Sequence, residues 1–219
     1  MKKSTNVNVT KKPRAYFVQR FMAYFVDMLL IGMISSLITI PFVNNSSLAK
    51  LSDQSNEVVQ NYVDKKIDIL TYMNQSIDIS YEQAQLTGFS NIITIVILVL
   101  YFIVFQIYQD GQTIGKRLMG IKIVKNDDSS LTMNDMIIRE LLNNSILADI
   151  LIAIITLFGK NAYFYGSITV ELIQYIFIII TLFMIILRRD GRGLPDIITG
   201  TKVINLSEIV EEDEEVCEN

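Results

Sequence analysis

The segment FMAYFVDMLLIGMISSLITIPFV, residues 21–43, is apolar along almost its whole length and holds one charged residue, Asp27. A helix needs about 20 mostly apolar residues to cross the hydrocarbon core of a bilayer, so this segment is long enough to span a membrane. The run is longer than the roughly 7–15 residues of a signal-peptide core and lacks a small-x-small cleavage site. We therefore expect it to be a retained membrane helix.

Three more segments have a similar character, at residues 89–108, 141–159 and 168–187. The third is the weakest, because Asn143, Asn144 and Asp149 lie within it. Hydrophobic residues make up 51% of the chain and charged residues 19%, below the roughly 25% of soluble globular proteins. The sequence thus predicts an all-α, polytopic membrane protein with a bundle of four transmembrane helices.

The distribution of basic residues predicts the orientation of these helices. With four spans, 15 of the 19 Lys and Arg residues fall on the side that holds both termini and the connection 109–140. Short loops on the cytoplasmic side carry an excess of Lys and Arg. We therefore expect both termini to be cytoplasmic and the insert 44–88 to be extracytoplasmic.

The two long connections carry different patterns. In the insert 44–88, Val59, Val63, Leu70 and Met73 recur at helical spacing, which is typical of an amphipathic helix on a membrane surface. A spacer without such a role is the alternative, and the sequence leaves both open.

The cytoplasmic connection contains signals for a strand and a helix. The alternation in 121–124 is typical of a short strand, and 126–130 has the composition of a turn, so the pattern indicates a short hairpin. Thr132, with Asp135 three residues on, is a candidate helix cap. The helix that it begins would carry Arg139 toward the third span.

Two charged residues need a physical reason: Arg20, just before the first span, and Asp27, within it. An Asp at the centre of a membrane helix costs about 2.5–3.5 kcal/mol, so Asp27 should face another helix or water rather than lipid. Arg20 precedes it by two turns, about 10 Å along the axis, which is too far for a direct ion pair. Arg20 is either an interfacial anchor or part of a site. Asp149 is as deep as Asp27, whereas Glu171 lies near the outer end of its span.

Composition argues against several chemistries. The chain has no His, and its one cysteine, Cys217, lies in the acidic tail 205–219. We therefore expect no disulfide, no metal site and no cofactor, and the absence of a GxSxG motif argues against an enzyme. The segment 111–117 has one residue too few between its two glycines for a phosphate-binding loop. We also expect no nucleic-acid partner.

The motif around that segment instead predicts contacts at the membrane surface. Three glycines, Gly111, Gly115 and Gly120, would permit close backbone turns there. Lys116 and Arg117 would meet lipid headgroups.

Three segments together resemble the RDD family of bacterial membrane proteins: RFMAYFVD at 20–27, DGQTIGKRLMGIKIV at 110–124 and RRDGRGLPDIITGTKVI at 188–204. The resemblance implies that Arg20, Asp27 and Asp196 are the family's functional residues. It also implies a bacterial plasma-membrane location and a compact helical bundle. Transport is the role usually suggested for the family, with cation/proton antiport for some members. Relatives usually have His before the last Asp, and Pro195 stands there in this chain.

The predicted organisation is a basic cytoplasmic segment 1–15, a membrane domain 16–204 and an acidic, disordered tail 205–219.

One hypothesis for the function of the chain is a transporter or ion-coupled exchanger that moves a small cation or proton with Asp27, Asp149 and Asp196. The other is a non-transporting regulator or assembly partner of another membrane protein. Either would work in the lipid bilayer, as a homo-oligomer or with another membrane protein. Pro195 suits the start of a helix, which would place Asp196 in its first turn, where the helix dipole favours a carboxylate. The functional alternative sets Asp196 against Arg20 at the cytoplasmic face, as a gate or ion site with Asp27.

Overall fold

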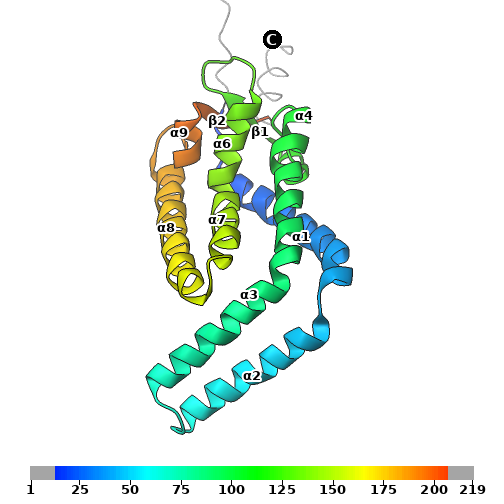
Figure 1. The fold of residues 1–219 in the computed structure, drawn as a ribbon. Helices are drawn as coiled ribbons and strands as arrows, with labels where there is room; N and C mark the ends of the chain where they lie inside the picture. Colours follow the sequence, from blue (N-terminus) through cyan, green and yellow to red (C-terminus); the bar gives the residue numbers. More distant parts are fainter. Residues whose placement is uncertain (1–12, 207–219) are drawn as a thin grey trace, which may run out of the picture. The chain divides into compact units, whose positions relative to one another are not determined.

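The computed structural model describes residues 13–206, so residues 1–12 and residues 207–219 of the predicted tail 205–219 lie outside the described part. The start of that predicted tail is wrong, because Asn205 is buried and belongs to a strand. The described chain is mostly helical (Figure 1). Its elements are α1 (Phe17–Thr39), the 3-10 turn η1 (Ile40–Phe42), α2 (Asn45–Val63), α3 (Ile69–Val99), the π-helical turn η2 (Leu100–Phe105), α4 (Gln106–Tyr108), α5 (Ile114–Leu118), β1 (Ile121–Lys125), α6 (Met133–Asn143), α7 (Ile146–Thr156), α8 (Lys160–Leu187), α9 (Leu194–Ile198) and β2 (Thr201–Asn205).

The described residues divide into two compact units. Residues 13–28, 104–139 and 180–206 form the first, and residues 29–103 and 140–179 form the second. The first unit therefore gathers the three segments that carry the sequence motifs.

A small sheet organises the first unit. Strands β1 and β2 pair antiparallel, from Ile121 opposite Asn205 to Lys125 opposite Thr201. Helices α5 and α9 pack against β1 and β2. The predicted strand is confirmed, but the predicted local hairpin is wrong, because the partner strand lies about 80 residues away along the chain. The described chain is thus mostly helical rather than all-α.

In the second unit, α2 packs against α3, and α3 against α7. Its core contains Ile31, Leu98, Phe102 and Ile146. The insert is helical, as two helices rather than one. Asn44 and Asp68 begin α2 and α3 by accepting backbone amides three residues on, and the chain turns between these helices at Lys65, with φ of 59°.

Within residues 13–206, three helical segments are long and apolar enough to cross a membrane: Phe17–Phe42, Ile69–Tyr108 and Lys160–Leu187. The fourth predicted span, 141–159, is not confirmed as one helix. Ser145, with φ of 58°, separates α6 from α7, and the 11 residues of α7 reach about 16 Å. That is roughly half of a hydrocarbon core of about 30 Å.

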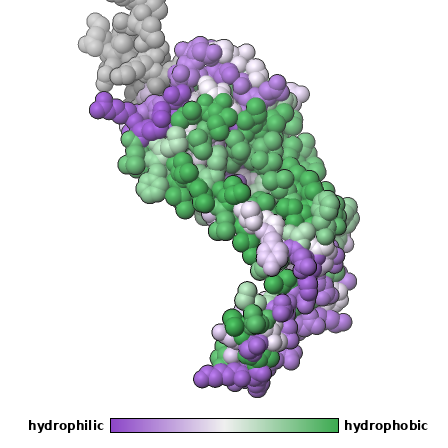
Figure 2. All heavy atoms as spheres, turned by 60° about the vertical axis from the view of Figure 1, so that its left-hand side comes forward, coloured by the Kyte–Doolittle hydropathy of each residue, from purple (hydrophilic) through white to green (hydrophobic). Residues whose placement is uncertain are grey.

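The surface of α8 fits a membrane environment. Figure 2, in which the side of α8 comes forward, shows extensive hydrophobic surface. Large apolar side chains project along this helix, with Ile173 63% and Phe183 59% exposed. Exposed apolar surface of this extent is costly in water and normal in lipid.

Candidate functional site

Asp196 occupies the first turn of α9, as the sequence predicts. Gly193 precedes the helix in an extended conformation, and Pro195 sits in its first turn. The Asp196 carboxylate accepts the Gly193 amide at 3.0 Å, which pairs an N–H group that the helix leaves free. Asp196 is only 2% exposed, so its charge must be compensated inside the protein.

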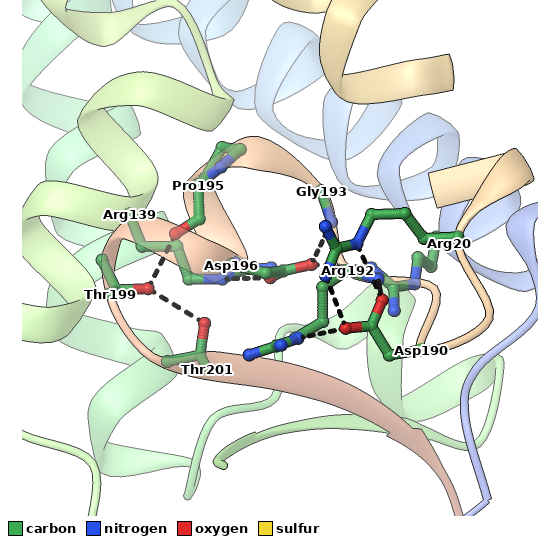
Figure 3. A network of polar contacts seen from close by, with 10 residues as sticks. Arg20, Arg139, Asp190, Arg192, Gly193, Pro195, Asp196, Thr199 and Thr201 are labelled. Carbon is green, nitrogen blue, oxygen red and sulfur yellow. Dashed lines mark hydrogen bonds and ion pairs between the residues drawn. The ribbon is translucent and has the colours of Figure 1, made fainter. Parts of the chain in front are cut away.

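Two arginines provide that compensation (Figure 3). Nη1 of Arg20, from α1, donates to Oδ2 of Asp196 at 2.9 Å. Nε and Nη2 of Arg139, from α6, both donate to Oδ1, at 3.2 and 2.9 Å. The side chains of Arg20 and Arg139 are 11% and 5% exposed. One carboxylate therefore joins three segments that are distant in sequence.

The electrostatics of Asp196 follow from competing effects. Burial would raise the pKa of Asp196, but the charges of Arg139 and Arg20 and the Gly193 amide outweigh it and hold the pKa below its usual range. Asp196 is therefore a permanent anion near neutral pH, and a carboxylate in this state is poorly suited to exchange protons there.

A second, more exposed group of charges flanks this network. Nε and Nη2 of Arg188 both donate hydrogen bonds to the Asp190 carboxylate at 2.9 Å, and Nε of Arg192 donates to it at 2.8 Å. The hydrogen bond from Arg188 comes first among the causes that lower the pKa of Asp190. Arg14 donates to the carbonyls of Arg188 and Arg189 at 2.8 and 3.1 Å. These carbonyls lie just beyond the end of α8, where the helix dipole favours a cation.

Asp27 is held by a different segment. Its Oδ2 accepts the Thr113 hydroxyl at 2.5 Å, and its Oδ1 accepts the Gly115 amide at 2.7 Å. Thr113 also caps α5 by accepting the Lys116 amide. Asp27 is 1% exposed. The prediction that Asp27 faces a partner on another element is confirmed, and the partner is the start of α5.

The glycines of the motif have steric roles. A Cβ on Gly115 would lie 2.1 Å from the carbonyl oxygen of Ala23 and 2.8 Å from Cγ of Asp27, so only glycine lets α5 approach α1 this closely. Gly111 and Gly120 adopt positive φ, at 84° and 63°. The predicted close turns are therefore present. Arg117 is exposed and donates to Gln109, and the lipid contacts of Lys116 and Arg117 stay a prediction.

Asp149 belongs to the second unit, apart from the Asp196 network. It is half-buried in the first turn of α7 and lines a cavity of about 890 Å³ between α3 and α7. Its carboxylate makes no hydrogen bond or ion pair with any residue between 13 and 206. Of the four predicted site residues, the structure therefore pairs Arg20 with Asp196, gives Asp27 its own partners and leaves Asp149 facing a cavity.

Sequence reasoning did not include Arg139 and Thr113 among the site residues. Helical spacing contained a signal for Arg139, because Met136, Arg139 and Glu140 fall on one face of α6. All three are buried, at 0%, 4% and 0% exposure. For Thr113, the signal was its position as a helix cap directly before Ile114 and Gly115.

The chain is similar to the uncharacterized protein YckC of Bacillus subtilis, with 33% identity over 114 residues that cover 52% of this chain and 60% of that protein. No solved structure matches it. The RDD family model matches residues 14–200, which include every residue of the Arg20–Asp196–Arg139 network and both partners of Asp27. The chain belongs to the RDD family.

Proposed function

We propose that this chain is a non-transporting, non-catalytic membrane protein that serves as a regulator or assembly partner of another membrane protein. The observation that carries the proposal is that its motif carboxylates are already used within the fold. Asp196 accepts four N–H groups through its two oxygens. Asp27 accepts a hydroxyl through one oxygen and an amide through the other. A cation would have to displace these strong donors.

The same buried network braces the first unit, whose surface carries exposed basic residues such as Arg14, Arg188 and Arg189. The arginines and Asp196 tie α1, α6 and α9 together, and α9 packs on the sheet. Between residues 13 and 206, the first unit has eleven basic and seven acidic residues. A positively charged, internally braced surface suits docking to an acidic partner or to anionic headgroups. We place this surface in the cytoplasm, with both termini, in keeping with the excess of Lys and Arg in residues 109–140 and at both ends of the chain.

Flux measurements test the non-transporting role. Vesicles containing the purified chain, loaded with pH-sensitive and cation-sensitive dyes, should respond to imposed gradients as protein-free vesicles do. Asp27→Asn and Asp196→Asn should not change the signal. Proton or cation flux that requires Asp27 or Asp196 would overturn the proposal.

Assembly is tested by capture from native membranes. A tagged full-length chain should hold a stoichiometric membrane partner in mild detergent. Arg139→Gln should release that partner, because it removes two donors to Asp196 and loosens the surface. Arg189→Gln, which alters an exposed side chain outside the network, should retain it. Recovery of the wild-type chain only as itself would contradict the assembly role.

A second candidate, an ion-coupled exchanger, is favoured by one observation: Asp149 has no hydrogen-bond or ion-pair partner among residues 13–206 and faces a cavity. An ionisable residue of this kind in an apolar helix often marks an ion pathway. Flux that is lost in Asp149→Asn and kept in Asp27→Asn would favour this candidate over the regulator.

A further inference from the structure

The cavity between α3 and α7 lies wholly within the second unit and has three kinds of lining. Asp149 supplies a carboxylate at one side. Tyr81 and Tyr163 form an aromatic pair, with ring centroids 5.6 Å apart. Polar side chains of α3 and an aliphatic wall complete it: Thr87, Asn91, Thr94, Ile92, Ile95 and Ile152.

The charge of this unit favours a cationic occupant. Residues 29–103 and 140–179 contain nine acidic residues and four lysines. Lys160, at the start of α8, already pairs with Asp78, so its charge is engaged outside the cavity lining. Within the described part of the chain, Asp149 is left as an unpaired carboxylate in an apolar helix, which is costly unless a cation or proton compensates it.

The lining distinguishes between kinds of cation. A bare metal ion prefers several oxygen ligands, and the described residues contain no group of three or more His, Cys, Asp or Glu side chains that could hold one. A cavity of about 890 Å³ is also far larger than a dehydrated ion and has the size of a site for a small organic molecule. A carboxylate attracts an ammonium group by a charge-assisted hydrogen bond, and the aromatic and aliphatic walls bury apolar surface.

We propose that this cavity binds a hydrophobic ammonium compound, with its charged nitrogen at Asp149 and its apolar body against the isoleucines of α3 and α7 and the Tyr81–Tyr163 pair. The site lies outside the Arg20–Asp196–Arg139 network and is independent of the role proposed for that network. In a regulator, it would be the place where a ligand acts on the second unit.

Binding is tested with a matched pair of probes, 1-naphthylmethylammonium and the neutral 1-naphthylmethanol. The full-length chain is placed in nanodiscs of zwitterionic lipid, and the probes are titrated by fluorescence, with empty discs to correct for partition into lipid. The wild-type chain should bind the ammonium saturably and about tenfold more tightly than the alcohol, the ratio expected for one charge-assisted hydrogen bond.

Three variants identify the site. Asp149→Asn should weaken ammonium binding by about tenfold and leave alcohol binding unchanged. Gly88→Leu should weaken binding of both probes, since Gly88 lines the cavity and a Cβ there meets nothing within 4 Å. Glu82→Gln, which removes an exposed carboxylate of α3 outside the lining, should bind as the wild type does. Thermal unfolding of each variant confirms that it is folded.

Two results would overturn the site: equal binding of both probes by the wild-type chain, or ammonium binding that Asp149→Asn leaves unchanged. The same discs do not report movement across a membrane. If vesicles show transport of the ammonium that requires Asp149, the site stands and the non-transporting role fails.

Discussion

At the scale of single residues, Asp196 shows how one carboxylate can hold two buried arginines. Its Oδ1 accepts hydrogen bonds from Arg139, and its Oδ2 accepts them from Arg20 and from the Gly193 amide. Sequence reasoning could place Asp196 in a first turn against Arg20, because the Pro195 signal is local and the motif pairs the two residues. It did not identify Arg139 as the second partner, since no local pattern shows which arginine a distant carboxylate will meet.

Removing the charge of Asp196 should therefore destabilise the protein strongly. Asp196→Asn leaves Arg20 and Arg139 facing each other without a counter-charge, and breaking a buried pair in this way costs about 3–5 kcal/mol. Asp190→Asn is the matched control, because Asp190 also joins two arginines but its side chain is 37% exposed and screened by solvent. Thermal unfolding in detergent should show a much larger loss for Asp196→Asn. Equal losses would mean that the buried network contributes little.

The lowered pKa of Asp196 predicts a dependence on pH. Its folded pKa lies below the unfolded value of about 3.9. The ionised carboxylate therefore stabilises the fold fully above that value, and this contribution is lost as the pH falls through the folded pKa. The difference in melting temperature between wild type and Asp196→Asn should be constant near neutral pH and shrink below about pH 4. A difference that grows with acidity would contradict this account.

At the scale of elements, the least predictable feature is the pairing of β1 with β2. The alternation in 121–124 indicated a strand, but the turn residues after it suggested a local hairpin. Asn126 instead donates its amide to Gly200, at the turn that precedes β2. The alternation of apolar and polar residues identifies a strand but not its partner, because pairing depends on contacts between residues that are distant in sequence.

Helix α5 depends on glycine for its approach to α1. Gly115→Ala would place a Cβ 2.1 Å from the Ala23 carbonyl oxygen, and backbone atoms at this distance cannot yield as a flexible side chain would. We expect a loss of at least about 3 kcal/mol, the upper end of overpacking costs, together with loss of the Asp27 hydrogen bond. Gly32→Ala, within α1, meets nothing within 4 Å and should be close to neutral. Comparison of the two unfolding temperatures is the measurement, and similar values would show that α5 can move away.

At the scale of the whole molecule, the number of membrane crossings depends on the segment 141–159. Hydropathy predicted the three long spans, because a long apolar run is a strong local signal. It failed to show that 141–159 is interrupted at Ser145, where a left-handed residue divides α6 from α7. Three crossings would put the termini on opposite sides of the membrane, whereas four would put them on the same side.

The single cysteine of the chain makes this question accessible. The Lys and Arg distribution favours both termini in the cytoplasm, which requires 141–159 to cross despite the short α7. A membrane-impermeant maleimide should then label Cys217 only after the cells are permeabilised. On a Cys217→Ser background, Ser4→Cys should behave in the same way, and Ser55→Cys, exposed on α2, should react in intact cells. If Cys217 reacts in intact cells while Ser4→Cys is protected, the chain crosses three times and the charge argument is wrong.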